Sequence, residues 1–298
     1  MIDYLIGVDG GGSGTRVRLA RTHHTPAMDY TEIAEGFAGP SALSQGIEPA
    51  WRAIGAAVAQ AFAAAGITPA PLANMAIGLG LSGVHNASWA QAFLAANPGY
   101  AAHVLNNDGF STVIGAHGGK PGAIIALGTG SVGQALLPNG EHREVGGWGF
   151  PSGDEGGGAW IGLRAVNYIQ QVLDGRLEGG ALANAVIALC GGSRPAIQDW
   201  LAGANATRFA TLAPLVVQHA EDDEAAAEIM QEAGYEVDLM AAALDPDYAL
   251  PLALCGGLGE AIVPWLEPET VDMIVAPQGD SAAGALRMIA MQLQGADR

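Results

Sequence analysis

Two glycine-rich turns of the same chemical kind occupy corresponding positions in the two halves of this chain. The first, Gly-Val-Asp-Gly-Gly-Gly-Ser-Gly-Thr-Arg, covers residues 7–16, and the second, Ala-Leu-Gly-Thr-Gly-Ser-Val-Gly, covers residues 126–133. Each follows a short apolar run and precedes a β-branched one, which predicts the turn of a β-hairpin. Glycine leaves backbone N–H groups uncovered and permits positive φ, so such a turn can bind phosphate through main-chain donors. Together the two turns predict a clamp for a polyphosphate. The hydroxyl side chains in the turns are those of Ser13, Thr15, Thr129 and Ser131.

Composition limits the possible partners. The chain has 298 residues, of which 50% are apolar and 14% charged, so we expect about two domains with a sizeable core. A net charge of −18 argues against nucleic acid or an anionic membrane as a partner. Lys120 is the single lysine. An anionic ligand would therefore be held by main-chain N–H groups, helix N-termini and a divalent cation.

The two cysteines and the N-terminal sequence indicate in which cellular compartment the protein is found. Cys190 and Cys255 form no Cys-x-x-Cys pair and lie in apolar or glycine-rich surroundings, so we expect buried, reduced thiols. No basic segment followed by an apolar stretch opens the chain, and the Ala-rich stretch 53–65 is too short to span a bilayer. We expect a soluble cytoplasmic protein.

Both halves show three strands followed by alternating helices and strands, which predicts a duplicated α/β plan with a ligand site in the cleft between two domains. A turn is expected at 23–27 and a mostly helical stretch at 157–243. The expected strands are 3–8, 16–21, 29–35, 72–78, 103–106, 123–127, 132–137, 142–145, 250–255 and 271–275. The expected helices are 47–65, 86–96, 109–116, 258–266 and 281–293.

A third glycine turn, Cys-Gly-Gly-Leu-Gly-Glu at 255–260, joins a strand to a helix in the second half. Gly256 and Gly257 would let the backbone approach a flat nucleoside ring. The alternative is a tight strand-to-helix turn that binds nothing. The presence of the two phosphate-type turns favours the nucleoside hypothesis.

Two aspartates follow predicted strands, and a third lies within the glycine-rich run 153–158. Asp108 follows a strand and opens a helix, so it is either a proton acceptor facing the cleft or a helix N-cap. Asp9 stands beside the first turn, either as a water-mediated Mg²⁺ partner or as a solvated turn residue. Asp154 lies just before a helix, where it could accept hydrogen bonds from sugar hydroxyls or cap the helix.

The three turns resemble, in order, the first phosphate, second phosphate and adenosine motifs of the sugar kinase, actin and heat-shock ATPase superfamily. Within that superfamily the chain is most similar to the N-acetylglucosamine and glucosamine kinases, which group with activating ATPases of benzoyl-CoA reductase. The most specific resemblance is carried by Gly-Gly-Trp-Gly-Phe-Pro-Ser-Gly-Asp-Glu-Gly at 146–156 and Ala-Trp-Ile-Gly-Leu-Arg at 159–164.

The resemblance implies two ribonuclease H-like domains, at 1–117 and 118–280, with a C-terminal helix at 281–298 that packs back on the first. It implies a homodimer that uses ATP and Mg²⁺ to phosphorylate the 6-hydroxyl of glucosamine or N-acetylglucosamine. The catalytic residue would be Asp108 and the metal residue Asp9. The sugar would contact Ser41, Asp108, Gly147, Trp148, Gly149 and Asp154. ATP would contact Gly11, Gly12, Ser13, Gly14, Thr15, Gly128, Thr129, Gly130, Ser131, Gly256 and Gly257.

One departure from the family and three alternatives remain open. Ala42 stands where the family usually has a sugar-contacting asparagine, so the sugar could be another hexose, and Ser41 could compensate. An ATP-hydrolysing activator of a reductase or dehydratase would hold an iron–sulfur cluster through cysteine thiolates. A sugar-responsive regulator would need a helix-turn-helix and a basic surface, which this chain does not show.

Overall fold

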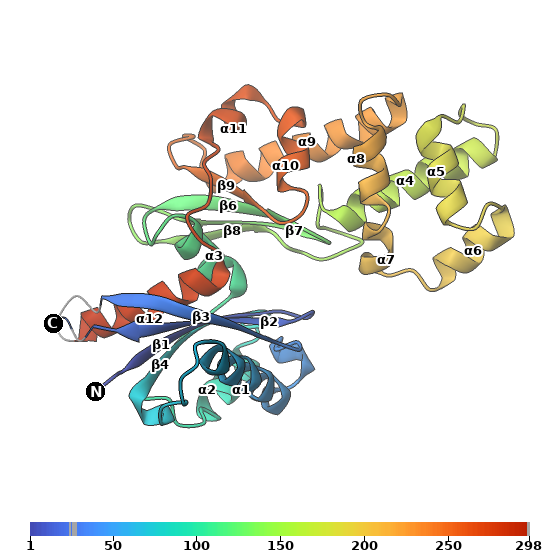
Figure 1. The fold of residues 1–298 in the computed structure, drawn as a ribbon. Helices are drawn as coiled ribbons and strands as arrows, with labels where there is room; N and C mark the ends of the chain where they lie inside the picture. Colours follow the sequence, from blue (N-terminus) through green and yellow to red (C-terminus); the bar gives the residue numbers. More distant parts are fainter. Residues whose placement is uncertain (24, 26–28, 297–298) are drawn as a thin grey trace. The chain divides into compact units, whose positions relative to one another are not determined.

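The computed structural model describes residues 1–23, 25 and 29–296. The expected turn at 23–27 lies mostly outside these residues. The chain divides into two compact units (Figure 1). Unit 1 comprises Met1–Gly122, Leu136–His142 and Ala276–Arg298, and unit 2 comprises Ala123–Ala135 and Arg143–Val275.

Unit 1 is built on a five-stranded sheet in the order β3-β2-β1-β4-β5. The strands are β1 (Tyr4–Gly10), β2 (Thr15–Thr22), β3 (Tyr30–Ala38), β4 (Met75–Leu81) and β5 (Ala102–Asn106). The pairs β1–β2 and β2–β3 are antiparallel, and the pairs β1–β4 and β4–β5 are parallel. The carboxyl ends of β1, β4 and β5 therefore meet at one edge, beside the β1–β2 turn. In doubly wound sheets, ligands bind at such an edge.

Helices cover both faces of this sheet (Figure 1). On one face, Ile54 and Phe62 of α1 (Ile47–Ala64) and Phe93 of α2 (Ala87–Ala95) pack into the main core. On the other face, Leu286 and Ile289 of α12 (Ser281–Ala296) pack on β1 and β4, and α3 (Asp108–Ala116) lies beside α12. Two short 3₁₀ turns, Leu43–Gln45 and Leu72–Asn74, precede α1 and β4.

Unit 2 repeats the strand plan in a four-stranded sheet of order β8-β7-β6-β9. The strands are β6 (Gly122–Leu127), β7 (Ser131–Leu136), β8 (His142–Gly146) and β9 (Leu252–Cys255), and β9 runs parallel to β6. As in unit 1, a strand from later in the chain pairs with the first strand of a hairpin. The predicted mixed α/β fold with a repeated plan is confirmed.

The expected helical stretch of unit 2 forms between β8 and β9. Its helices are α4 (Gly158–Leu173), α5 (Ala181–Leu189), α6 (Arg194–Ala202), α7 (Ala206–Ala210), α8 (Ala213–His219) and α9 (Glu224–Leu244). No helix in the part of the chain that the structure describes combines the length and apolar character needed to cross a bilayer.

Three element predictions were wrong. Residues 271–275 form no strand, because the helix α11 (Pro268–Met273) begins at Pro268 and includes the first of them. Ile274 forms a single isolated β-bridge with Leu252. The helix expected at 258–266 breaks into α10 (Gly259–Ile262) and a 3₁₀ turn, Val263–Trp265, at Pro264. The strand expected at 72–78 begins only at Met75, after the 3₁₀ turn.

Candidate functional site

The first glycine turn joins β1 to β2, as the sequence predicts. Its carbonyls are occupied: Gly11 O accepts from the N–H groups of Ser41 and Ala42 at 3.1 and 3.2 Å, and Gly12 O accepts from Gln45 Nε2 at 3.1 Å. Among the described residues, the N–H groups of Gly12, Ser13 and Gly14 have no hydrogen-bond acceptor. A turn with occupied carbonyls and available N–H groups is suited to binding an anion.

The segment 39–42 holds this turn in place. Thr15 Oγ1 lies 2.7 Å from both Gly39 O and Ser41 Oγ, and the side chains of Thr15 and Ser41 are buried. Ala42 is buried as well, with 3% of its surface exposed. In this arrangement the two hydroxyls tie the segment to β2, and their roles toward ATP and sugar stay predictions.

Asp108 is the first residue of α3 and is separated from β5 (Ala102–Asn106) by Asn107. The N-cap of α3 is Asn107, whose side-chain oxygen accepts from the Phe110 N–H at 2.6 Å, so the alternative role of Asp108 as the cap is wrong. Burial raises the pKa of Asp108, although the Gly109 N–H and His85 oppose the rise. A carboxylate with a raised pKa holds a proton more tightly, which suits a group that accepts one from a hydroxyl.

Asp9 lies near the end of β1, opposite Arg16 of β2. Burial raises the pKa of Asp9, and the carboxylates of Asp108 and Asp280 raise it further, against a hydrogen bond from Ser281 and the charge of Arg16. Unit 1 therefore gathers carboxylates that repel one another beside the first turn. A divalent cation would relieve that repulsion, so the residues fit the expected Mg²⁺.

No group of three or more His, Cys, Asp or Glu side chains that could hold a metal occurs in the described ranges. Mg²⁺ at nucleotide sites is commonly held by one or two carboxylates, with phosphates and water completing its ligands. Asp9 meets that smaller requirement.

Sequence reasoning missed the residues at the start of α12. Asp280 binds Arg16 at 2.7 Å and Arg18 at 2.9 Å, and the Ser281 hydroxyl lies 2.7 Å from Ser111 Oγ. Arg16 and Asp280 are 264 positions apart, so no local pattern in the sequence could indicate this contact.

The second glycine turn joins β6 to β7 in unit 2 and lies against the start of α4. Gly128 O accepts from the Gly158 N–H and Thr129 O from the Ala159 N–H, both at 2.8 Å. Ser131 is buried and donates to Glu155 O at 2.6 Å. As in the first turn, carbonyls are occupied by neighbouring N–H groups.

Asp154 links this turn to the Gly-Trp-Gly segment. It adopts a left-handed backbone with φ 63°, which is uncommon for a residue other than glycine. Its Oδ1 accepts from the Gly149 N–H at 3.1 Å, and a Cβ on Gly130 would overlap its carboxylate. Trp148 is 85% exposed. Backbone strain of this kind gathers at functional sites, and the sugar-binding role of Asp154 remains a prediction.

The third glycine turn follows β9 and lies against the second. The Leu258 N–H donates to Leu127 O at 3.1 Å, and Gly256, with φ 87°, passes so close to Leu127 that a Cβ would overlap its carbonyl. Gly257 is exposed and faces open space. The structure thus brings the predicted second phosphate turn and nucleoside turn together in unit 2.

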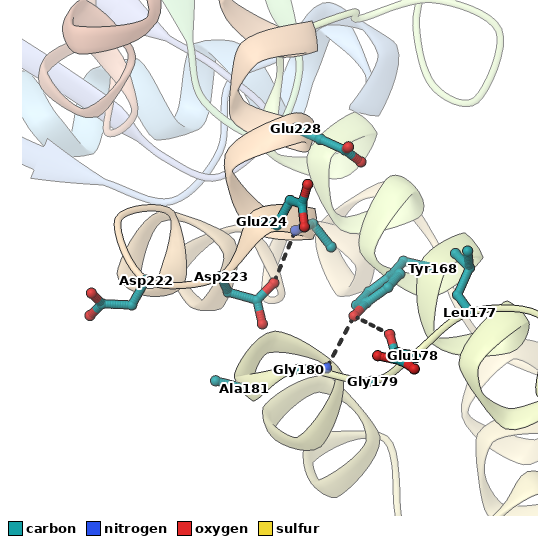
Figure 2. A pocket seen from close by; sticks show the side chains of 11 residues that line it. Tyr168, Leu177, Glu178, Gly179, Gly180, Ala181, Asp222, Asp223, Glu224 and Glu228 are labelled. Carbon is teal, nitrogen blue, oxygen red and sulfur yellow. Dashed lines mark hydrogen bonds between the residues drawn. The ribbon is translucent and has the colours of Figure 1, made fainter.

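Unit 2 also contains an open hollow of about 550 Å³ that sequence reasoning did not predict (Figure 2). It lies among α4, the segment before α5 and the start of α9, and its rim is acidic. Several of its polar groups already hold the helices together: Tyr168 Oη donates to Glu178 O, and Asp223 accepts the N–H groups of Ala225 and Ala226. None of the predicted site residues lines it.

Comparison with known proteins identifies the family. The model of the BadF/BadG/BcrA/BcrD ATPase family matches residues 6–288. The chain belongs to the BadF/BadG/BcrA/BcrD ATPase family. The predicted resemblance is confirmed.

The proteins that the chain matches include sugar kinases. The chain is 31% identical to glucosamine kinase GspK of Vibrio cholerae over 286 residues, which cover 96% of this chain and 95% of the relative. It is 27% identical over 177 residues to the N-acetylmuramic acid/N-acetylglucosamine kinase of Clostridium acetobutylicum, and the matched region covers 59% of this chain and 56% of the relative. The solved structure of a candidate N-acetylglucosamine kinase from Chromobacterium violaceum matches with a TM-score of 0.89 and 51% sequence identity. The match covers 97% of this chain and 99% of that one.

Proposed function

We propose that this protein transfers the γ-phosphate of ATP to the 6-hydroxyl of glucosamine or N-acetylglucosamine. The observation that carries the proposal is the placement of Asp108, which is half-buried with a raised pKa just past the carboxyl end of β5 and interacts with Asp9 beside the first glycine turn. The kinases among its relatives support the substrate class.

In this mechanism the glycine turns bind the phosphates through main-chain N–H groups, because the chain has few cationic side chains. Asp108 accepts the proton of the attacking hydroxyl as the phosphoryl group moves. Asp9 would hold Mg²⁺, which when bound neutralises charge on the phosphates. Phosphoryl transfer depends mainly on positioning and charge neutralisation, so this small set of side chains suffices.

The sugar contacts are assigned to Asp154, Ser41 and the Gly147–Gly149 segment. A carboxylate accepts hydrogen bonds from vicinal hydroxyls, and an exposed indole such as that of Trp148 offers an apolar face to a sugar ring. The absence of an asparagine at Ala42 leads us to expect modest discrimination between glucosamine, its N-acetyl derivative and plain hexoses.

A screen of amino sugars and hexoses with Mg²⁺ and ATP, reading ADP release, tests the proposal. We expect glucosamine or N-acetylglucosamine to stimulate ADP formation most, and ³¹P–¹H coupling in the product to place phosphate on carbon 6. Failure of every sugar to raise ADP release above the basal rate would contradict a sugar kinase. Phosphate on another carbon would contradict only the assignment of the 6-hydroxyl as acceptor and would leave the kinase activity in place.

The rival activator function requires thiolates for an iron–sulfur cluster. Cys190 is buried at the end of α5, and Cys255 ends β9 at the third glycine turn. Burial raises the pKa of both thiols, which disfavours the thiolate form that a cluster needs. Iron and acid-labile sulfide in protein purified without oxygen would favour the activator.

A further inference from the structure

The start of α12 contacts two side chains that face each other beside the first glycine turn. Asp9 of β1 and Arg16 of β2 are directly opposite in the antiparallel register, so their side chains project from the same face of the sheet. Gly7, two residues before Asp9, packs on Ala282 and Leu286 of α12. The face that carries Asp9 and Arg16 is therefore the face that α12 covers.

Asp280 precedes α12 and accepts four hydrogen bonds. Arg18 donates twice, from Nε and Nη2 at 2.9 Å each, Arg16 donates from Nη1 at 2.7 Å, and the Ala283 N–H donates at 2.9 Å. Burial alone would raise the pKa of Asp280, but the bonds from Arg18, Ala283 and Arg16 lower it to about 2. Asp280 thus stays charged while it caps the helix.

The two arginines differ in how fully they are engaged. Arg18 also pairs with Glu32 at 2.6 Å and Glu35 at 3.2 Å, so three carboxylates hold it. In the described ranges, the Arg16 side chain has Asp280 as its one hydrogen-bond partner, and its guanidinium lies 5.5 Å from the Phe37 ring centroid. The Arg16 side chain is 44% exposed, which leaves N–H donors available to a ligand.

Ser281, the next residue, contacts the carboxylate side of the pair. Its hydroxyl lies 2.7 Å from Ser111 Oγ and 3.4 Å from Asp108 O, and the Ser281 side chain lowers the pKa of the nearby Asp9 carboxyl. Ser281 is 7% exposed and Ser111 is fully buried. Two consecutive residues, Asp280 just before α12 and Ser281 at its start, therefore contact the cation and lie beside the carboxylate that flank the first turn.

We propose that Asp280 and Ser281 are positioning residues, which fix the Arg16–Asp9 pair so that Arg16 contacts the phosphates of ATP. The inference rests on the proposed function, because it requires ATP at the first turn. A guanidinium suits this role, since its planar N–H groups match phosphate oxygens. The strong negative charge around it makes one oriented cation important for an anionic ligand.

The experiment measures the dissociation constant for ATP by calorimetry, and KM for ATP and for sugar, using the full chain. We expect Arg16→Gln and Asp280→Asn each to weaken ATP binding by about tenfold, as for a hydrogen bond to a charged group, while KM for the sugar is unchanged. Arg16→Lys should recover part of the loss. Ser281→Ala should weaken ATP binding less than Arg16→Gln, and Ser281→Thr should restore it.

The double variant Arg16→Gln/Asp280→Asn separates positioning from general damage. If Asp280 acts through Arg16, the double variant binds ATP no more weakly than Arg16→Gln alone. Glu48→Gln, which breaks the exposed Arg52–Glu48 pair on α1, is the matched control and should change nothing. Wild-type affinity in Arg16→Gln, or losses that simply add in the double variant, would overturn the inference. Failure of the wild-type chain to bind ATP would instead overturn the proposed function.

Discussion

At the scale of single residues, burial changes the properties of the two carboxylates beside the first turn. Asp108 and Asp9 both have raised pKa values, for which burial is the main cause. Asp280, close to them, has a lowered pKa because two arginines and a helix N–H donate to it. The surroundings thus shift the pKa of the same residue type in opposite directions, which suits the proposed proton acceptor Asp108 and keeps Asp280 charged.

Asp108→Asn removes the proposed proton acceptor. We expect kcat to fall by at least about 10²-fold, with the ATP dissociation constant nearly unchanged, because the amide cannot accept the hydroxyl proton. Steady-state kinetics measures kcat and calorimetry measures the ATP dissociation constant. Asp272→Asn, at an exposed residue, is the control. Near-normal kcat in Asp108→Asn would remove Asp108 from the mechanism.

The same substitution should also stabilise the folded protein. Burial makes the ionised Asp108 more costly in the folded than in the unfolded state, and asparagine avoids that cost. The cost is absent below the ordinary pKa of 3.8, grows as the pH rises from 3.8 to the raised pKa, and is constant above it. Thermal melts should therefore show a gain of about 0.5–2 kcal/mol at pH 7 that shrinks toward pH 3. A loss of stability at pH 7 would contradict the burial argument.

At the scale of elements, α12 and α3 pack unusually closely in unit 1. A Cβ on Gly284 of α12 would overlap Ser111 O, so only glycine allows this approach. The close packing brings Ser281 within hydrogen-bonding distance of Ser111 and aligns Asp280 with the arginines of β2. Helix position and site chemistry are therefore linked through one small residue.

Gly284→Ala tests that link. We expect a loss of about 1–3 kcal/mol in the free energy of unfolding, because the added methyl forces α12 away from α3. Gly55→Ala in α1 is the matched control: Gly55 has open space around it, so alanine should add about 0.4–1 kcal/mol. Chemical denaturation measures both. Equal responses of the two variants would show that the packing is not tight.

Local patterns predicted some elements and not others. Both hairpin turns and the start of α3 after β5 follow from glycine, β-branched and Asn-Asp patterns near one another in the sequence. The segment 271–275 looked like a strand because two valines flank it, but Pro268 and Glu269 begin a helix there. The Asp280–Arg16 contact joins residues brought together only by the folded sheet, so a single sequence could not reveal it.

At the scale of the whole molecule, two units carry the same strand order and each presents a glycine turn after its first strand. Unit 1 adds the carboxylates and the Asp280 network, and unit 2 adds the third glycine turn and the Gly-Trp-Gly segment.

The expected homodimer belongs to this scale. Light scattering coupled to size-exclusion chromatography should give about twice the 30.2 kDa mass of one chain. A mass of one chain across micromolar concentrations would contradict a homodimer without affecting the proposed reaction.

Transfer of phosphate from γ-³²P-labelled ATP to glucosamine or N-acetylglucosamine tests whether this protein is an amino-sugar kinase. We expect labelled sugar phosphate in amounts equal to the ADP formed with wild-type protein, and at least about 10²-fold less per unit time with Asp108→Asn. Label released only as inorganic phosphate, at a rate that no sugar changes, would contradict it.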